Sequence, residues 1–490
     1  MVNIFPKTII FLSSLFLLKL FLSFYLPLLN DEAYAVAVSK EYSISFFDHP
    51  PIGFWSSQLF SEITGIKNEF FFRFPFIIFG LITTLVIYQI GKTIKNQNVG
   101  LWSATLYNVA PFYFFSGGVF VVPDGPLNLG IALVTLFILK LHKPPHNHDN
   151  NLLLFLAFSL AWCFACKYQG FLIGIGCILV LIFSSRRESL TQNPFLYISF
   201  FIALIGALPT LIWNYQNDWI SFQFHQSRQN FEINFLNLGI MLIASMLYLI
   251  PQSIIIPIQT LSYKKTRIIL SENEKNLLLI AFPNIILFLF IFATSERSFP
   301  HWIMPGWLLL LPIIANYLNE HITKLGRNIF IVSIISIWSI LGIFILHSQT
   351  GFLTNHLAKI PKWDNTIELI NWKPMYEEIE EIIKSENKNK KPKIAAFSWT
   401  EAGQFSSLMK NKYQTLVLDT DPHHFSYLEK NKNKKGSTYL LKISLGNKPD
   451  IDFILNRIKK YDKNAYHLKS FIISRGHRHY ATGSLFHLIQ

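Results

Sequence analysis

Residues 9–29 read IIFLSSLFLLKLFLSFYLPLL, and residues 30–55 continue as NDEAYAVAVSKEYSISFFDHPPIGFW. The first stretch approaches the ~20 apolar residues that a helix needs to cross a bilayer. It is too long for the core of a signal peptide and lacks a small-residue cleavage site, so we interpret it as a retained transmembrane helix. The second stretch places Asp31 and Glu32 where that helix should end, and Asp48 and His49 follow before two prolines.

The composition extends this interpretation to most of the chain. Of the 490 residues, 51% are hydrophobic and 15% are charged, whereas a soluble domain carries roughly 25% charged residues. The sequence therefore predicts a polytopic α-helical membrane protein. The net charge of +14 is explained by basic loops and a basic tail, so we expect anionic lipid headgroups rather than nucleic acid as the counter-charge. The three cysteines lie in apolar runs and are interpreted as packing residues.

Apolar length and flanking residues predict about eleven transmembrane helices. We place them at 7–29, 75–92, 99–115, 126–141, 151–166, 168–184, 194–212, 236–258, 276–294, 303–319 and 327–348.

The distribution of Lys and Arg predicts that the N-terminus lies inside. The inner loops then read GKTIKNQN, LHKPPHNHDN, SSRRESLTQN, SYKKTRIILSENEK and NEHITKLGRN, and each carries Lys or Arg. The first loop, residues 30–55, faces outward with the tail after residue 348. We therefore predict a membrane domain at 1–348 and an extracytoplasmic domain at 349–490. In the tail, the helical pattern MYEEIEEIIKSE precedes the strand-like runs KIAAFS, QTLVLD and TYLLKIS, which indicates a small α/β domain.

Ionisable side chains gather at the outer ends of the predicted helices. Charged groups are costly at bilayer depth unless they are paired or hydrated, so we expect these groups to converge on one cavity. They are Asp31, Glu32, Asp124, Lys167, Arg228 and Arg297.

Each of these residues also has a structural interpretation. Asp31 suits a helix N-cap, and Asp124 lies in the turn-forming sequence PDGP. Lys167 could extend to the membrane surface, and Arg228 and Arg297 could bind lipid phosphates. Their occurrence on the same predicted side of the membrane favours one shared functional site over five separate structural roles.

Acids and cations together suit the transfer of a sugar from a lipid phosphate. A carboxylate can act as a general base on an acceptor hydroxyl or can orient the acceptor. Lys and Arg can hold a phosphate and stabilise the charge that develops on it as it leaves. No nucleotide-sugar pool exists outside the cytoplasm, so a lipid carrier is the reasonable donor.

Six motifs in this order resemble the GT-C glycosyltransferases, in particular bacterial relatives of the protein O-mannosyltransferases and of the lipid A aminoarabinose and galacturonic acid transferases. The resemblance covers roughly residues 1–350. The motifs are DEAY at 31–34, FDHPPIGFW at 47–55, PDGPL at 123–127, KY at 167–168, WNYQNDWISFQFHQSR at 213–228 and PHWIMPGW at 300–307.

The resemblance implies a GT-C fold with juxtamembrane helices in the first outer loop. Asp31 matches the catalytic or acceptor-orienting acid, Glu32 its companion, and Asp124 a second acid that shapes the site. The donor would be a polyprenyl-phosphate sugar, transferred with inversion to lipid A, lipopolysaccharide or another envelope glycan or protein. The enzyme would lie in the bacterial inner membrane, with its site and C-terminal domain on the periplasmic side.

The residues expected to bind substrate are Asp48, His49, Lys167, Tyr168, Arg228, Arg297 and His301. We prefer a substrate contact for His49 to a metal site, because one His and one Asp are too few ligands for zinc. We assign no cofactor and leave the need for a divalent cation open.

Two other classes of function compete with a transferase. A transporter or flippase of lipid-linked sugars would use the same cations without chemistry, but transporters favour charges near the membrane midplane and internal repeats. A non-catalytic scaffold would not need several acids on its outer face. Both alternatives are weaker than the enzyme.

Overall fold

The described chain divides into two compact units, and each unit draws on separate parts of the sequence. The first comprises Met1–Ser23, Ser43–Ser56 and Arg73–Ile337, and the second comprises Phe24–Tyr42, Ser57–Phe72 and Trp338–Gln490. The structure is a computed structural model and describes residues 4–144, 146–227, 232–262, 269–295, 297–353, 365–386, 392–419, 421–428, 437–445, 449–475 and 478–489.

All the regular secondary structure among the described residues of the first unit is helical. Its helices are α5 (Gln97–Val109), α6 (Pro111–Phe115), α7 (Asp124–Leu141), α8 (Asp149–Cys166), α9 (Gly170–Phe183), α10 (Arg187–Thr191), α11 (Pro194–Ile205), α12 (Leu208–Gln216), α13 (Ile220–Gln226), α14 (Phe235–Leu247), α15 (Gln252–Ser262), α16 (Glu272–Thr294), η1 (Pro300–Ile303) and α17 (Met304–His321). Four further helices begin in one unit and end in the other: α1 (Ile4–Tyr25), α3 (Ile52–Thr64), α4 (Glu69–Ile94) and α18 (Lys324–Thr350).

Within the described ranges, seven helices are long and apolar enough to cross a membrane, and up to nine spans result if each of two bent pairs counts as one. The bent pairs correspond to the predicted helices at 194–212 and 236–258. Two other predicted spans are shorter than expected. Helix α9 has 14 residues, and the predicted helix at 99–115 breaks at Ala110, which is extended because Pro111 follows it.

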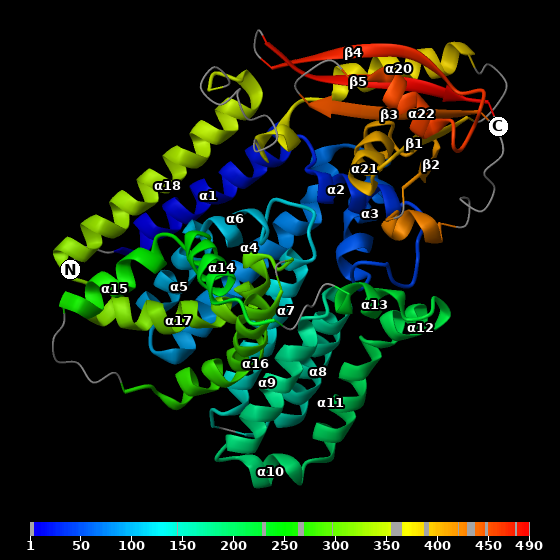
Figure 1. The fold of residues 1–490 in the computed structure, drawn as a ribbon. Coiled ribbons are helices and arrows are strands. Elements are labelled where there is room, and N and C mark those ends of the chain that lie inside the picture. The colour runs from blue at the N-terminus through cyan, green and yellow to red at the C-terminus, as the bar shows by residue number, and fades with distance from the viewer. Residues whose placement is uncertain are drawn as a thin grey trace. The chain divides into compact units, whose positions relative to one another are not determined.

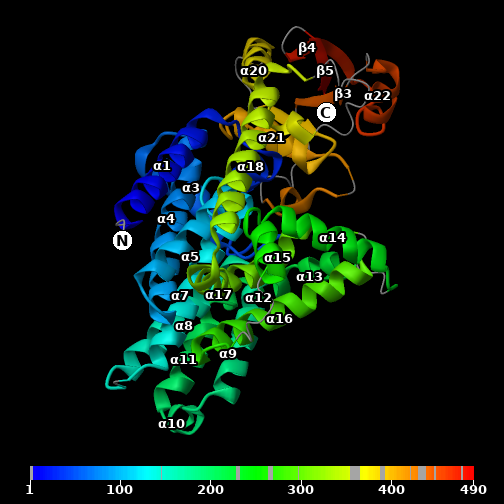
Figure 2. The same ribbon diagram turned by 90° about the vertical axis from the view of Figure 1, so that its left-hand side faces the viewer.

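Helices α7, α8 and α11 lie side by side, and α10 lies at their far end (Figure 2). The turn between α8 and α9 is so tight that a Cβ on Gly170 would lie 2.3 Å from the carbonyl oxygen of Cys163. Only glycine fits such an approach of backbone to backbone. Residues 167–169 are therefore held at the junction of these two helices.

The second unit carries the predicted α/β domain, built on a five-stranded sheet (Figure 1). The strand order is β2-β1-β3-β5-β4, where β1 is parallel to β2 and β3, and β5 is antiparallel to β3 and β4. Its elements are α2 (Asn30–Val38), η3 (Asn365–Leu369), α20 (Lys373–Glu386), β1 (Lys393–Ala396), α21 (Trp399–Leu408), β2 (Gln414–Val417), η4 (His423–Tyr427), β3 (Thr438–Leu445), α22 (Ile451–Ile458), β4 (Tyr466–Arg475) and β5 (Arg478–Leu488).

Each face of this sheet has its own core because successive strand side chains point to opposite faces. Tyr439 and Leu441 of β3 pack with α20 and α21 on one face. Leu440 lies between them in sequence and packs with Ile454 and Ile458 of α22 on the other face.

Candidate active site

The centre of the candidate site in the first unit is a buried ion pair. The Lys167 ammonium donates to both carboxylate oxygens of Asp124, at 2.9 and 3.0 Å. The two side chains are only 6% and 8% exposed. The expectation that Lys167 extends to the membrane surface is therefore wrong, because Asp124 provides an opposite charge within the protein.

Local sequence explains how the pair forms. Asp124 is the first residue of α7, after Pro123 at the N-cap position. Lys167 is the extended residue that ends α8, and its carbonyl accepts the Gly170 N–H at 2.8 Å. The pair thus joins the start of one helix to the end of its neighbour.

His49 lies beside this pair. A Cβ on Gly53 would lie 3.1 Å from the Cα of Pro123, so the DHPPIG turn packs directly on the residue before Asp124. Burial, reinforced by the Lys167 ammonium, lowers the pKa of His49 to about 3. The His49 imidazole is therefore neutral at physiological pH, and its buried Nδ1 has no hydrogen-bond partner among the described residues.

His301 approaches from the sixth motif, PHWIMPGW at 300–307. It lies in η1, within electrostatic range of Lys167 and Asp124. The Gln169 amide donates to the carbonyl of Trp302 at 3.0 Å and so ties the α8–α9 turn to this segment. The ion pair and the two histidines beside it thus come from four motifs that are far apart in the sequence.

Tyr168 extends the site toward α13. Its ring contacts Phe222 and His225, with centroid separations of 5.5 Å in both cases. The hydroxyls of Tyr168 and Ser221 are buried. The Tyr168 hydroxyl lies near Ser221 and Asn214, but within the described ranges neither hydroxyl makes a hydrogen bond of full geometry. Asp48 also acts electrostatically on both Tyr168 and His49. Buried polar atoms are normally paired, so this cluster suits a polar ligand.

Asp31 and Glu32 belong to the second unit. Helix α2 begins at Asn30 with Leu29 at the N-cap, so the interpretation of Asp31 as an N-cap is wrong. Glu32 serves the helix end instead, because its fully buried carboxylate accepts the Leu29 N–H at 3.0 Å. Asp31 is exposed.

The two arginines complete the set of predicted residues. Arg297 is exposed in the turn between α16 and η1. Arg228 lies outside the described residues. The described part of the chain contains no cluster of three or more His, Cys, Asp or Glu side chains that could hold a metal ion.

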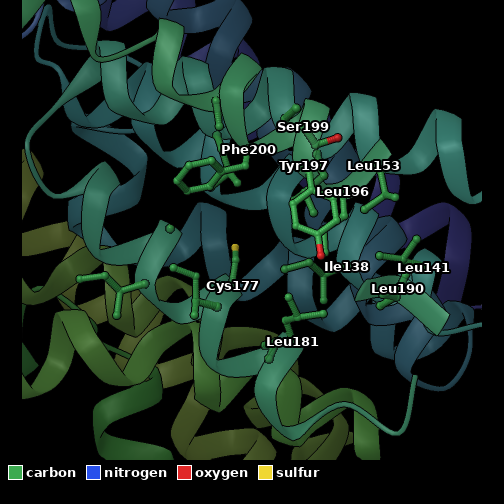
Figure 3. A pocket seen from close by; sticks show the side chains of 18 of the residues that line it. Ile138, Leu141, Leu153, Cys177, Leu181, Leu190, Leu196, Tyr197, Ser199 and Phe200 are labelled. Carbon is green, nitrogen blue, oxygen red and sulfur yellow. The ribbon is translucent and has the colours of Figure 1, made fainter. Parts of the chain in front are cut away.

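An apolar cavity of about 400 Å³ runs along α8 and α9 (Figure 3). It reaches from Phe164 and Phe171, next to the turn that carries Lys167, to Leu141 and Leu190 at the opposite helix ends. The lining residues Ile178 and Phe200 are 51% and 54% exposed, so the cavity is open at the side. Its lining lacks carboxylates and suits a hydrocarbon chain.

Sequence reasoning did not select Gln169, Ser221 or His225 as site residues. Gln169 follows the motif KY directly, and Ser221 and His225 lie in the motif WNYQNDWISFQFHQSR. A search of those motifs for every polar side chain, instead of for charges alone, would have found them.

The chain has similarity to known glycosyltransferases in sequence and in fold. Residues 48–213 match the family model of dolichyl-phosphate-mannose-protein mannosyltransferases. The structure of ArnT from Cupriavidus metallidurans bound to undecaprenyl phosphate superposes with a TM-score of 0.61 at 13% identity, covering 97% of each chain. The apo form of the same protein also gives a TM-score of 0.61 at 13% identity, covering 98% of each chain. A comparison with curated protein sequences gives no match.

Proposed function

We propose that the chain is a glycosyltransferase of the GT-C superfamily and an inverting enzyme with a polyprenyl-phosphate sugar as donor. The family match over residues 48–213 and the fold shared with ArnT support this proposal. The acceptor is lipid A, lipopolysaccharide or another glycan or protein of the envelope, and the reaction takes place on the periplasmic side of a bacterial inner membrane. One observation carries the proposal: beside the buried Asp124–Lys167 pair lie buried polar atoms, such as His49 Nδ1 and Gln169 Oε1, that have no hydrogen-bond partner among the residues that the structure describes.

Lys167 provides the contact with the leaving phosphate. An ammonium has three N–H donors, and Lys167 donates to the two oxygens of Asp124. A third N–H is available to a phosphate oxygen, and the positive charge stabilises the negative charge that builds there as the sugar leaves. Asp124 holds the ammonium in place, and the neutral His49 can donate or accept one further hydrogen bond.

Asp31 is the acid assigned to the acceptor. It is exposed, whereas the neighbouring Glu32 is buried and bonded to the Leu29 N–H. Glu32 therefore supports the helix that carries Asp31. For an acceptor hydroxyl, Asp31 takes the proton as the oxygen attacks the sugar carbon. For an acceptor phosphate, which is already anionic, Asp31 orients the acceptor instead.

The remaining residues contact the substrates. Asp48, Tyr168 and His301 border the sugar beside the ion pair, and Arg228 and Arg297 attract the anionic headgroups of donor and acceptor. The apolar cavity along α8 and α9 takes the prenyl chain, because it begins beside the turn that carries Lys167 and opens at the side.

Transfer in cells carrying single variants tests this proposal. We expect Asp31→Asn to abolish addition of the sugar while the protein still inserts in the membrane. Asp452→Asn is the matched control, since Asp452 is an exposed acid in the first turn of α22 in the same unit. Full transfer by Asp31→Asn would refute the role of Asp31. Full transfer by Lys167→Ala, with unchanged affinity for undecaprenyl phosphate, would remove Lys167 from the phosphate site.

A further inference from the structure

We infer that the C-terminal domain is a positioning element that holds helix α2, and with it Asp31, in place for transfer. The inference rests on the proposed function of Asp31. It adds that residues 338 to 390 positions away from their partners in α2 set the location of this acid, within a single compact unit that contains both segments.

Amide side chains of the C-terminal domain bind the backbone at both ends of α2. The Gln404 amide donates to the carbonyl of Leu28 at 2.9 Å and to Asn30 Oδ1 at 3.2 Å. The Asn411 amide donates to the carbonyl of Val36 at 3.1 Å. These bonds fix the start and the end of a nine-residue helix.

A close approach of backbones fixes the distance between α2 and α21. A Cβ on Gly403 would lie 2.8 Å from both the Cα and the N of Tyr34. No Cβ fits at that separation unless one helix moves. The absence of a side chain at Gly403 therefore allows α2 to lie directly on α21.

Tyr34 fixes the rotation of α2 about its axis. Its hydroxyl accepts the His424 N–H at 3.0 Å, and its ring meets Trp399 edge-on with the centroids 5.0 Å apart. Tyr34 follows Asp31 by three positions, and residues at this spacing share a helix face. The contacts of Tyr34 thus set the direction in which Asp31 points.

A glutamate adds a contact at the start of α2. Glu368 in η3 accepts the Asn30 N–H at 3.4 Å. Burial raises the pKa of Glu368, and the nearby Glu32 carboxylate acts in the same direction. Four separate segments of the C-terminal domain therefore touch α2: η3, α21, the turn after α21 and η4.

A helix of this length needs such support. Isolated helices shorter than ~12–15 residues are marginal in water, and α2 has nine residues. Its position therefore depends on packing rather than on its own stability. In catalysis a misplacement of about 1 Å can cost roughly 100-fold in rate, so these contacts control transfer.

Two substitutions test the inference with little change in size. Asn411→Asp retains the acceptor for the Ser406 hydroxyl, at 2.9 Å, but sets a carboxylate oxygen against the Val36 carbonyl. Asp also tolerates the left-handed backbone at this position, where φ is 53°. Gly403→Ala forces α2 away from α21. We expect a fall in transfer of about ten-fold for the first and roughly 10- to 100-fold for the second.

Matched controls leave α2 untouched. Ser407→Ala removes a hydroxyl of α21 whose bond, to the Gln404 carbonyl, lies within the helix. Gly342→Ala adds a Cβ at a helical glycine with no heavy atom within 4 Å. Both variants should retain transfer.

Three measurements are made on each full-length variant in native membrane lipid. They are sugar transfer in cells, affinity for undecaprenyl phosphate, and hydrogen exchange of residues 30–38. The inference predicts reduced transfer, unchanged affinity and faster exchange in α2, while the strands of the sheet retain their protection. Faster exchange with full transfer would overturn the inference, and so would unchanged exchange in both variants.

The Asp31→Asn variant separates this inference from the proposed function. If Asp31→Asn retains transfer, the role of Asp31 is wrong and the positioning role falls with it. If Asp31→Asn abolishes transfer but Asn411→Asp and Gly403→Ala do not reduce it, only the positioning role is wrong.

Discussion

Replacement of Lys167 by Met separates the structural role of the buried ion pair from its chemical role. The substitution keeps most of the side-chain volume but removes the ammonium. It deletes both hydrogen bonds to Asp124 and leaves that carboxylate buried without its counter-charge. The variant Lys167→Met/Asp124→Asn removes both charges and leaves only a neutral amide.

The two variants should lose different amounts of the free energy of unfolding. Breaking a buried pair by removal of one partner costs about 3–5 kcal/mol, which changes the unfolding equilibrium by roughly two to three and a half orders of magnitude. A buried neutral group without a partner costs about 1–3 kcal/mol. The double variant should therefore regain about 2 kcal/mol relative to Lys167→Met.

Native cysteines next to the pair provide the assay. Cys163 and Cys166 are free, buried and in the last turn of α8, directly before Lys167. A thiol-reactive fluorescent maleimide therefore reports when this region unfolds in denaturant. Lys92→Met is the control, because Lys92 is exposed in the last turn of α4.

Two results would refute the reasoning. Equal stability of Lys167→Met and Lys92→Met would show that the pair does not behave as a buried ion pair. Full sugar transfer by the double variant would show that Lys167 contributes only to folding. We expect the double variant to be inactive, more stable than Lys167→Met, and about 1–3 kcal/mol less stable than the wild type.

Three other outcomes can be measured on the same protein. In the unfolded chain His49 takes up a proton near pH 6.5, whereas in the folded protein it does so only near pH 3. The free energy of unfolding should therefore fall between pH 6.5 and pH 4.5, by up to about 1.4 kcal/mol per pH unit. The same slope in His49→Gln would contradict this expectation. The Ser199 hydroxyl is buried beside the cavity, so Ser199→Phe should fill part of it and raise the KM for the donor several-fold. Ile198 lies outside the lining, so Ile198→Phe should leave the KM unchanged. Equal KM values for the two variants would exclude the cavity as the binding site of the prenyl chain. Gly170→Ala should destabilise the α8–α9 turn. Gly239→Ala should have no such effect, because its added Cβ meets no atom within 4 Å. Equal unfolding curves for the two variants would contradict the close approach of the backbones at Gly170.

Much of the helical architecture could be predicted, because apolar length is a local property of the sequence. Nine of the eleven predicted spans correspond to a helix long enough to cross a membrane or to a bent helix pair, whereas α9 and the broken helix at 99–115 are too short. The strand-like runs KIAAFS, QTLVLD and TYLLKIS coincide with β1, β2 and β3. The final hairpin, β4 and β5, was missed. In strand β4 only Phe471–Arg475 alternate buried with exposed residues, and exposed Ile472 and buried Arg475 break the usual match of apolar with buried. Its sequence therefore gives a weaker strand signal than the apolar runs of β1, β2 and β3.

The site was only partly predictable. The distribution of Lys and Arg among the loops predicts that Asp124 and Lys167 lie on the same side of the membrane. It does not predict that they pair, because the pairing depends on a close contact between α7 and the α8–α9 turn. The division of the first outer loop was not predictable either. Asp31 and Glu32 belong with the C-terminal domain, whereas Asp48 and His49 belong with the helices of the first unit, because long-range backbone contacts decide this division.

The central claim is that the chain transfers a sugar from a polyprenyl phosphate, and mass spectrometry of the envelope tests it most directly. Lipid A, glycans and envelope proteins are compared in cells that carry the wild-type chain, the Asp31→Asn variant at equal membrane abundance, or no copy. We predict one sugar modification that is present with the wild type and absent from the other two. An envelope that is identical in all three would contradict the claim.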